Sequence, residues 1–316
     1  MKVKLGELTK IRTGKLDANA SSPDGEYPFF TCSKEPLKIS SYSYDCECVL
    51  VAGNGDLNVK YYNGKFDAYQ RTYIIEDNSN GRLYLPYLYY FMNGYVEELR
   101  KLSIGGVIKY IKLRNLTDAL IELPEIETQK YIVSILSKIK ELIDFRYQEL
   151  KMLENLIKAR FIELFGEPLS NQKGWQTMSI VEAAPIKSQR GDLGDEVWLL
   201  NLDAVEAQTG TVLFKHRVQS GKINASTVFF TTESVLYSKL RPYLNKVVMP
   251  NEDGVATSEM IPMYPLADRL NRAYLCYWLR SDAFVRHISE KVAGAKMPRV
   301  SMDYFRSLAI ELPPLE

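Results

Sequence analysis

A central stretch, from Pro124 to Phe165, constrains this sequence more than any other. Its apolar residues recur in alternating steps of three and four, which is the period of one face of an α-helix. Pro124 precedes the pattern, and Gly166 followed by Pro168 supplies a left-handed cap and a residue that cannot continue a helix. A helix from Glu127 to Phe165 would be roughly 58 Å long. We therefore predict one long central helix of coiled-coil type.

The apolar residues of this stretch form a seam that an isolated helix would leave in water. The other faces carry charges of both signs, as a solvated or coiled-coil surface does. We expect either a second copy of the chain or helices of another protein to cover the seam. A long helix of an ordinary bundle is the alternative. The residues assigned to helix pairing are Ile132, Ile139, Leu142, Leu153 and Leu156.

Length and composition favour two domains and a connector. The chain has 316 residues, of which 46% are hydrophobic and 25% are charged, so two cores of ordinary size are possible. We predict a first domain at 1–123, the helix at 124–167 and a second domain at 168–316. The N-terminus lacks the apolar run of a secretory signal, and no later stretch is long enough to span a bilayer. We expect a cytoplasmic protein without a membrane partner.

The second domain repeats the first. Residues Gly105–Glu127 align with Gly294–Glu316 without a gap, so that Ile121-Glu-Leu-Pro124 matches Ile310-Glu-Leu-Pro313. The upstream matches, which keep the same order, are Tyr87–Met92 with Tyr274–Leu279 and Val49-Leu50 with Val235-Leu236. This pattern indicates an internal duplication with the helix between the two copies. The sequence stops where the second copy would begin its own long helix. Either the natural sequence continues beyond this point, or the protein is a truncated product that lacks this helix and whose central helix pairs with a partner elsewhere.

Each copy has the pattern of a mixed α/β unit of the α+β class. In the first copy, Val3–Ile11 is a short apolar element and Arg12–Lys15 a polar turn. Alternating or buried apolar runs predict strands, and apolar steps of three and four predict a helix. The predicted strands are Cys48–Ala52, Asn58–Tyr62, Ala68–Glu76 and Ala119–Leu123, and the predicted helix is Tyr84–Arg100.

Two features of the repeat resemble a known family. Each copy closes with an Ile-Glu-Leu-Pro strand-to-helix junction, at Ile121–Pro124 and at Ile310–Pro313. Val235-Leu-Tyr-Ser-Lys-Leu-Arg-Pro-Tyr-Leu-Asn-Lys246, with Ala256-Thr-Ser258 behind it, is similar to a frequent segment of that family's recognition domains. The chain resembles the DNA specificity subunits of type I restriction-modification systems, in which two target-recognition domains flank a helical conserved region. The resemblance covers nearly the whole chain and departs from the family plan chiefly in the missing distal helix.

The resemblance implies a fold, a function and a set of partners. Each domain should take the α/β fold of the small recognition domain of DNA adenine methyltransferases. The family's members do no chemistry themselves. They recognise a split target on double-stranded DNA and hold methyltransferase subunits, and in the full complex the restriction and translocase subunits, against it. S-adenosylmethionine is then expected on the methyltransferase subunit, and no cofactor on this chain.

The sequence, considered without the family, also lacks a recognisable set of catalytic residues. The only Pro-Pro pair is Pro313-Pro314, so the Asn/Asp-Pro-Pro-Tyr/Phe segment that adenine methyltransferases use for the flipped base is missing. The glycine loops lack the Gly-Lys-Ser/Thr of a phosphate-binding loop. Four cysteines and two histidines do not make a paired metal-ligand array, so we expect no metal site.

DNA recognition requires donors for phosphate oxygens, which position the protein, and side chains that pair with base edges, which specify the sequence. Both copies place such residues in short loops. Arg241 is the first candidate, because arginine can pair with O6 and N7 of guanine; a surface ion pair with Glu259 or Asp253 is the alternative. The glycine pairs also fit plain tight turns. Gln70-Arg71 falls where the repeat places Ser258-Glu259, as two unequal half-sites require.

The candidate DNA-binding residues of the first copy are Arg12, Thr13, Lys15, Asn54, Asn58, Lys60, Gln70, Arg71, Gly105, Lys109 and Tyr110. Those of the second copy are Lys187, Gln189, Arg190, Lys239, Arg241, Tyr243, Asn245, Lys246, Lys296 and Arg299. Two recognition domains on a rigid helix would meet bases a fixed distance apart. The expected target is therefore two short blocks with an unread spacer.

Two other function classes fit parts of the sequence. A helical scaffold that holds proteins and does not bind DNA would keep the same architecture, and the formal net charge of only +1 favours it. An enzyme with a site at Glu122, Glu311 or the cysteines is the third class. Carboxylates at matching strand ends more simply face solvent, so this class is the least favoured.

Overall fold

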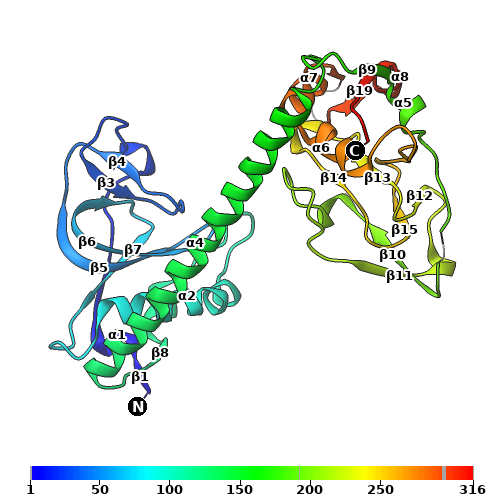
Figure 1. Ribbon diagram of the computed structural model, residues 1–316. Coiled ribbons are helices and arrows are strands. Elements are labelled where there is room, and N and C mark those ends of the chain that lie inside the picture. Colours follow the sequence, from blue (N-terminus) through cyan, green and yellow to red (C-terminus); the bar gives the residue numbers. More distant parts are fainter. Residues whose placement is uncertain (1, 192, 294–296, 316) are drawn as a thin grey trace. The chain divides into compact units, whose positions relative to one another are not determined.

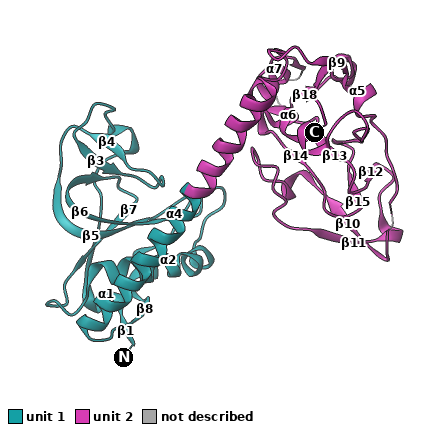
Figure 2. Ribbon diagram, viewed as in Figure 1, with its two compact units in different colours: residues 1–148 teal, residues 149–316 magenta. Residues whose placement is uncertain are grey.

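The structure is a computed structural model that describes residues 2–191, 193–293 and 297–315. It divides into two compact units, unit 1 at Met1–Gln148 and unit 2 at Glu149–Glu316 (Figure 2). A single helix, α4 (Ile126–Phe165), contributes residues to both units (Figure 1). The predicted long helix is thereby confirmed, and Gly166 provides the predicted left-handed cap with a φ of +84°. The domain boundaries given above stay a prediction.

Unit 1 is a mostly antiparallel sheet, with one parallel pair between β3 and β6, and one long helix against it. The sheet has six strands in the order β2-β7-β5-β6-β3-β4, and a second pair joins β1 to β8. Apart from α4, its elements are β1 (Lys2–Lys4), α1 (Leu5–Leu8), β2 (Thr9–Thr13), η1 (Ala18–Ala20), β3 (Tyr27–Phe30), β4 (Leu37–Ile39), β5 (Tyr44–Ala52), β6 (Val59–Ala68), β7 (Thr72–Asp77), α2 (Leu85–Leu102), α3 (Leu113–Thr117) and β8 (Leu120–Glu122).

Successive side chains of β5 point to opposite faces of the sheet and enter two different cores of unit 1. Val49 and Val51 face α2 and form one core with it, while Cys48 and Leu50 point to the opposite side, into a smaller core. The helix α2 begins with Pro86 in its first turn and buries a stripe on one side. The buried residues of that stripe are Leu85, Leu88, Met92, Val96 and Leu99.

Unit 2 builds on the same order of parts. Its sheets are ordered β14-β13-β16 and β11-β10-β15-β12, with β19 paired to β9 and β17 to β18. Its further elements are β9 (Gln176–Ser179), α5 (Ile180–Ala183), β10 (Glu196–Leu200), η2 (Leu202–Ala204), β11 (His216–Gln219), η3 (Ser220–Lys222), β12 (Thr227–Phe230), β13 (Val235–Ser238), η4 (Pro242–Leu244), β14 (Val247–Val248), β15 (Gly254–Thr257), β16 (Met260–Met263), α6 (Arg272–Arg280), α7 (Asp282–Glu290), β17 (Val292–Ala293), β18 (Arg299–Val300), α8 (Met302–Ser307) and β19 (Ala309–Leu312).

The central strands of the two units match residue by residue. In unit 2, Val235 and Tyr237 on β13 face the helices, and Leu236 points to the other core, as Val49, Val51 and Leu50 do in unit 1. The closing strands match as well, because β8 pairs antiparallel with β1 and β19 pairs antiparallel with β9. The predicted duplication is therefore confirmed.

Three local predictions were wrong. Arg12 and Thr13 are not in a turn but end β2, which is paired with β7. The strand predicted at 68–76 is two strands, since Ala68 ends β6 and β7 begins only at Thr72. The apolar element at 3–11 is broken by the short helix α1, because Leu5 and Leu8 must both turn into the core. In the first two cases strand pairing overrides the local pattern, and in the third case core packing does.

The start of α4 is tied to unit 1 through a buried amide. Gln129 is fully buried, and its Nε2 donates to the carbonyl oxygens of Arg82 (2.8 Å) and Pro124 (2.9 Å). Its Oε1 accepts from the N–H of Tyr84 (2.8 Å). All polar atoms of this side chain thus have partners, as a buried amide requires. No described helix is long and apolar enough to cross a membrane.

Candidate nucleic-acid interface

Four loops of unit 1 are connected by backbone hydrogen bonds. The N–H of Gly53 donates to the carbonyl oxygen of Arg71 (2.8 Å), and the N–H of Ile111 donates to that of Gly53 (2.9 Å). The N–H of Gly55 donates to the carbonyl oxygen of Lys109 (3.0 Å). Residues 14–16 extend the same surface through a bridge to the 69–71 turn. We call this surface rim 1; it consists of residues 14–16, 53–55, 69–71 and 104–111.

Unit 2 has the same arrangement of bonds. The N–H of Lys239 donates to the carbonyl oxygen of Glu259 (3.0 Å), and the N–H of Val300 donates to that of Lys239 (2.9 Å). The N–H of Arg241 donates to the carbonyl oxygen of Pro298 (2.8 Å). We call this surface rim 2; it consists of residues 239–241, 258–259 and 297–300. The two rims share one backbone frame.

The shared frame carries different side chains in the two units. Position by position, Gly53 corresponds to Lys239, Arg71 to Glu259, and Gly55 to Arg241, because each pair makes the same backbone bonds. The bridge between Asn54 and Tyr110 in rim 1 corresponds to the bridge between Leu240 and Arg299 in rim 2. The predicted alignment of Gln70-Arg71 with Ser258-Glu259 is confirmed. Sequence reasoning missed Leu240 as the counterpart of Asn54.

Arg241 occupies a left-handed backbone position. Its φ is +50°, and its counterpart Gly55 has a φ of +66°. Glycine adopts this conformation freely, whereas a residue with a Cβ is strained there. The side chain of Arg241 is exposed, and among the described residues it forms no ion pair. Glu259 instead accepts from Arg299, at 2.8 and 3.3 Å, so the predicted alternative of an Arg241–Glu259 ion pair was wrong.

Rim 1 brings together exposed donors from separate parts of the sequence. Lys15, Arg71 and Lys109 are exposed, and none of them has an ion-pair partner within the described ranges. Asn54 is half-buried beside Tyr110, where the hairpin bonds of residues 104–110 hold it. The remaining predicted residues of this region are Thr13, which is exposed at the end of β2, Gln70, which donates to Asp17 (2.8 Å), and Gly105, which lies in the hairpin.

Arg12, another predicted DNA-binding residue, has partners within unit 1. Its Nε lies 2.8 Å from a carboxylate oxygen of Glu76, and its guanidinium stands 4.7 Å from the ring centre of Tyr44. These contacts join strands of the sheet in unit 1. The side chain is therefore occupied in the folded protein.

The predicted DNA-binding residues Asn58 and Lys60 also have partners within the fold. Nδ2 of Asn58 donates to the carbonyl oxygens of Cys32 (2.8 Å) and Asp56 (2.9 Å). Nζ of Lys60 donates to the carbonyl oxygen of Ser33 (2.6 Å) and to Asn58. Burial lowers the pKa of the Lys60 ammonium group. Together they hold the loop at 32–33 against β6.

Two predicted residues of unit 2 are structural as well. Asn245 is buried, and its Nδ2 donates to the carbonyl oxygen of Arg280 (3.0 Å), which ties η4 to the end of α6. Nζ of Lys246 donates to the carbonyl oxygen of Leu202 (2.6 Å), and burial lowers its pKa. The donors of both side chains thus have partners within unit 2, and their assignment to DNA binding stays a prediction.

The other predicted residues of unit 2 fall in three places. Lys187 and Arg190 lie over the rings of Tyr264 (4.9 Å) and Phe229 (5.6 Å). The backbone of Gln189 pairs with Phe229 beside β12. Lys239, which is half-buried, and the exposed residues Arg241 and Tyr243 belong to rim 2 or to the η4 turn that follows it. Arg299 is paired as described, and Lys296 lies outside the described residues. Among the described residues, no group of three His, Cys, Asp or Glu side chains is arranged to hold a metal ion.

The exposed part of α4 carries many large apolar side chains. Every side chain from residue 138 to residue 160 is exposed. This set includes the predicted pairing residues Ile139, Leu142, Leu153 and Leu156, whereas Ile132 is half-buried in unit 1. Leaving so many large aliphatic side chains in water is costly.

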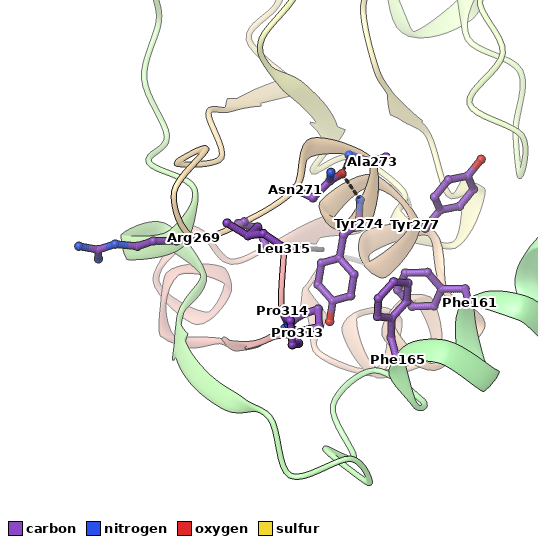
Figure 3. A pocket seen from close by; sticks show the side chains of 11 residues that line it. Phe161, Phe165, Arg269, Asn271, Ala273, Tyr274, Tyr277, Pro313, Pro314 and Leu315 are labelled. Carbon is purple, nitrogen blue, oxygen red and sulfur yellow. Dashed lines mark hydrogen bonds between the residues drawn. The ribbon is translucent and has the colours of Figure 1, made fainter.

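Where α4 ends, it packs on α6 of unit 2. The ring of Phe161 stacks on Tyr274 with centres 5.4 Å apart, and Phe165 meets the same ring edge-on at 5.0 Å. Beside these rings lies an apolar groove of about 310 Å³ that also contacts Leu270 and Pro313 (Figure 3). In the repeat these two residues correspond to Leu83 and Pro124, next to which the first turn of α4 is seated in unit 1.

Comparison with known proteins agrees with this architecture. Residues 1–155 match the model of the type I restriction modification DNA specificity domain. The chain is 28% identical to the type I restriction enzyme EcoDI specificity subunit of Escherichia coli, over 99% of this chain and 77% of that protein. The chain is similar to the type I restriction-modification specificity subunits. Another relative in this family, the type I restriction enzyme MjaVIII specificity subunit of Methanocaldococcus jannaschii, is 22% identical over 99% of the chain and 82% of the relative.

Solved structures of the specificity-subunit family share the fold. The S subunit of the type I restriction-modification system from M. genitalium aligns with a TM-score of 0.57 at 14% identity, over 98% of this chain and 83% of that chain. A chain from a structure concerning complex assembly and conformational transition of the type I R-M system aligns with a TM-score of 0.51 at 17% identity, over 100% and 86%. The predicted α/β class with a central helix is thus confirmed.

Proposed function

We propose that the chain recognises a two-block DNA target, with rim 1 binding one block and rim 2 the other. The observation that carries this proposal is the shared backbone frame with different side chains at equivalent positions. One frame presented twice places two sets of donors in the same local geometry. Different side chains on it then select different bases. The specificity domain matched over residues 1–155, which includes all of rim 1, supports this proposal over a scaffold that does not bind DNA.

Within each rim the side chains divide into two roles. In rim 1, the exposed cations Lys15, Arg71 and Lys109 are suited to phosphate oxygens, and the amide of Asn54 is suited to adenine. In rim 2, Arg241 is suited to guanine, because its guanidinium is not engaged by a described carboxylate. The Glu259–Arg299 pair limits how far Arg299 can reach.

The partners follow from the exposed seam of α4 and the groove beside it. We propose that helices of methyltransferase subunits pack on Ile139, Leu142, Leu153 and Leu156, or that a second copy of the chain does so. In the full complex, restriction and translocase subunits join this assembly. The chain itself is then non-catalytic and cytoplasmic. S-adenosylmethionine is bound by the methyltransferase subunit.

Methylation mapping tests the recognition proposal. The chain is expressed with its methyltransferase and restriction subunits, and modified adenines are located by sequencing the host DNA. The expected result is one motif of two short blocks separated by a constant spacer. A double variant of rim 1, Lys15→Ala with Arg71→Ala, is expected to weaken methylation and to reduce the salt dependence of binding, because two phosphate contacts are lost.

One control variant and two contrary outcomes make this test decisive. A variant at an exposed cation outside the rims, Lys173→Ala, should leave both methylation and binding unchanged. If the scaffold alternative held, the rim variants would assemble normally and no motif would depend on them. Binding of the wild-type complex to all duplexes with equal affinity would overturn the proposal.

A further inference from the structure

The hairpin at Ile104–Tyr110 of rim 1 exposes apolar side chains at its tip. Val107 is fully exposed and Ile108 is 63% exposed. The hairpin is closed by two hydrogen bonds, in which the N–H of Ile104 donates to the carbonyl oxygen of Tyr110 (3.0 Å) and the reverse bond measures 2.9 Å. Such a closed loop cannot fold its tip back to bury these residues.

The position of the tip is determined by the rest of rim 1. The bond from Gly55 to the carbonyl oxygen of Lys109 fixes the hairpin beside Asn54. Gly105 allows the sharp turn, since its φ is +118° and a Cβ there would lie 2.6 Å from the carbonyl oxygen of Ile108. The aliphatic tip is therefore presented next to the residues proposed to contact DNA.

We propose that Val107 and Ile108 insert as a wedge between stacked base pairs of the bound duplex. This inference rests on the proposed DNA-recognition function and adds to it a mechanical step, the local unstacking of the target. Proteins that deform DNA insert aliphatic side chains such as Leu, Ile or Met at a base step and hold the flanking phosphates with cations. Rim 1 supplies both elements.

The charge around the tip favours DNA over a protein as the occupant. Lys109 and Lys112 flank it, both exposed and neither in an ion pair within the described residues. A protein-binding patch would be a broad apolar area. Here Val107 and Ile108 project from the tip of a narrow hairpin, and the less exposed Ile104 and Tyr110 lie at its base. Rim 2 has a similar feature. Met297, which corresponds to Ile108, is half exposed, and it comes one residue before Pro298, whose carbonyl oxygen accepts from the N–H of Arg241.

A fluorescent base tests the wedge directly. The methyltransferase complex is bound to a duplex carrying the mapped methylation site, with 2-aminopurine placed in turn at each adenine position of the block assigned to rim 1 and its flanks. We expect the fluorescence to rise at one step with the wild-type chain and to stay at the level of the free duplex with the Val107→Ser, Ile108→Ser double variant. Affinity of the variant should fall roughly tenfold, as expected when a wedge contact is lost.

A second duplex separates the wedge from other roles of the loop. A mismatch at the responsive step removes most of the stacking that the wedge must break, so the variant should recover affinity on it. Leu120→Ser, which changes an exposed aliphatic residue away from the rim, is the matched control and should behave as wild type. Val107→Leu should retain the signal.

Three outcomes would overturn the inference. The first is wild-type binding with no fluorescence change at any position. The second is an equal loss of affinity on the intact and the mismatched duplex. The third is failure of the double variant to assemble with the methyltransferase subunits, which would assign the tip to a protein contact. Absence of sequence-dependent binding by the wild-type complex would instead refute the underlying function.

Discussion

Replacing Arg241 by glycine should stabilise unit 2 and weaken DNA binding at the same time. Arg241 holds a φ of +50° at the position where unit 1 has Gly55 at +66°. A left-handed residue with a Cβ costs about 1 kcal/mol relative to glycine. Arg241→Gly is therefore expected to raise the free energy of unfolding by about 1 kcal/mol, or to raise the melting temperature by roughly 2–4 °C for a domain of this size.

The same substitution removes the guanidinium proposed to pair with guanine. A lost bidentate contact costs about 1–3 kcal/mol, which corresponds to a roughly 5- to 150-fold weaker affinity. Unfolding is followed by thermal melting of the purified chain, and binding by fluorescence anisotropy on a duplex carrying the mapped site. A gain in stability together with a loss of DNA affinity would show that the strained backbone of Arg241 is tolerated because its side chain binds DNA.

Two variants separate strain from recognition. Arg241→Ala removes the guanidinium but keeps a Cβ at the left-handed position, so it should lose affinity without gaining stability. Gly55→Ala introduces the same strain in rim 1, and since its Cβ would meet no atom within 4 Å, the expected loss of about 1 kcal/mol comes from the backbone alone. Wild-type affinity of Arg241→Gly, or a loss of stability in it, would refute this reasoning.

Three further predictions concern α4. Gln129→Leu leaves three backbone partners unpaired, so it should lower the free energy of unfolding, measured by urea titration, by roughly 2–4 kcal/mol. Unchanged stability would show that this amide does not stabilise the start of the helix. The double variant Leu142→Lys, Leu153→Lys should keep the melting temperature of the chain within about 1 °C of the wild-type value but abolish co-purification with methyltransferase subunits. Retained assembly would show that the seam does not bind these subunits. Insertion of four alanines after Lys151 lengthens the helix by about 6 Å, or about two base pairs, so mapped motifs should keep their blocks and gain spacer, and an unchanged spacer would contradict the role of the helix.

Much of the architecture was accessible from local patterns. The helix α4 was predicted to within one residue at its start, because its apolar period, Pro124 and Gly166 are all local signals. The duplication was found because Ile121–Pro124 and Ile310–Pro313 keep the same spacing to their neighbours. Strand boundaries were less accessible, since the break between Ala68 and Thr72 depends on where partner strands end.

The candidate site, like the fold, was predictable in part from local sequence patterns. By itself the sequence determined the two-domain plan, the long helix between the copies and the loops rich in donors, because periodicity and repeat spacing depend on near neighbours in the chain. Only the tertiary structure decided which donors are free. The side-chain amides of Asn58 and Asn245 donate to the carbonyl oxygens of Cys32 and Arg280, which are far away in sequence. The backbone N–H of Arg241 is hydrogen-bonded, whereas its side chain is exposed to solvent. Hydrogen-bond partners are set by folding in three dimensions, and that is why residue type and loop position were insufficient to choose among them.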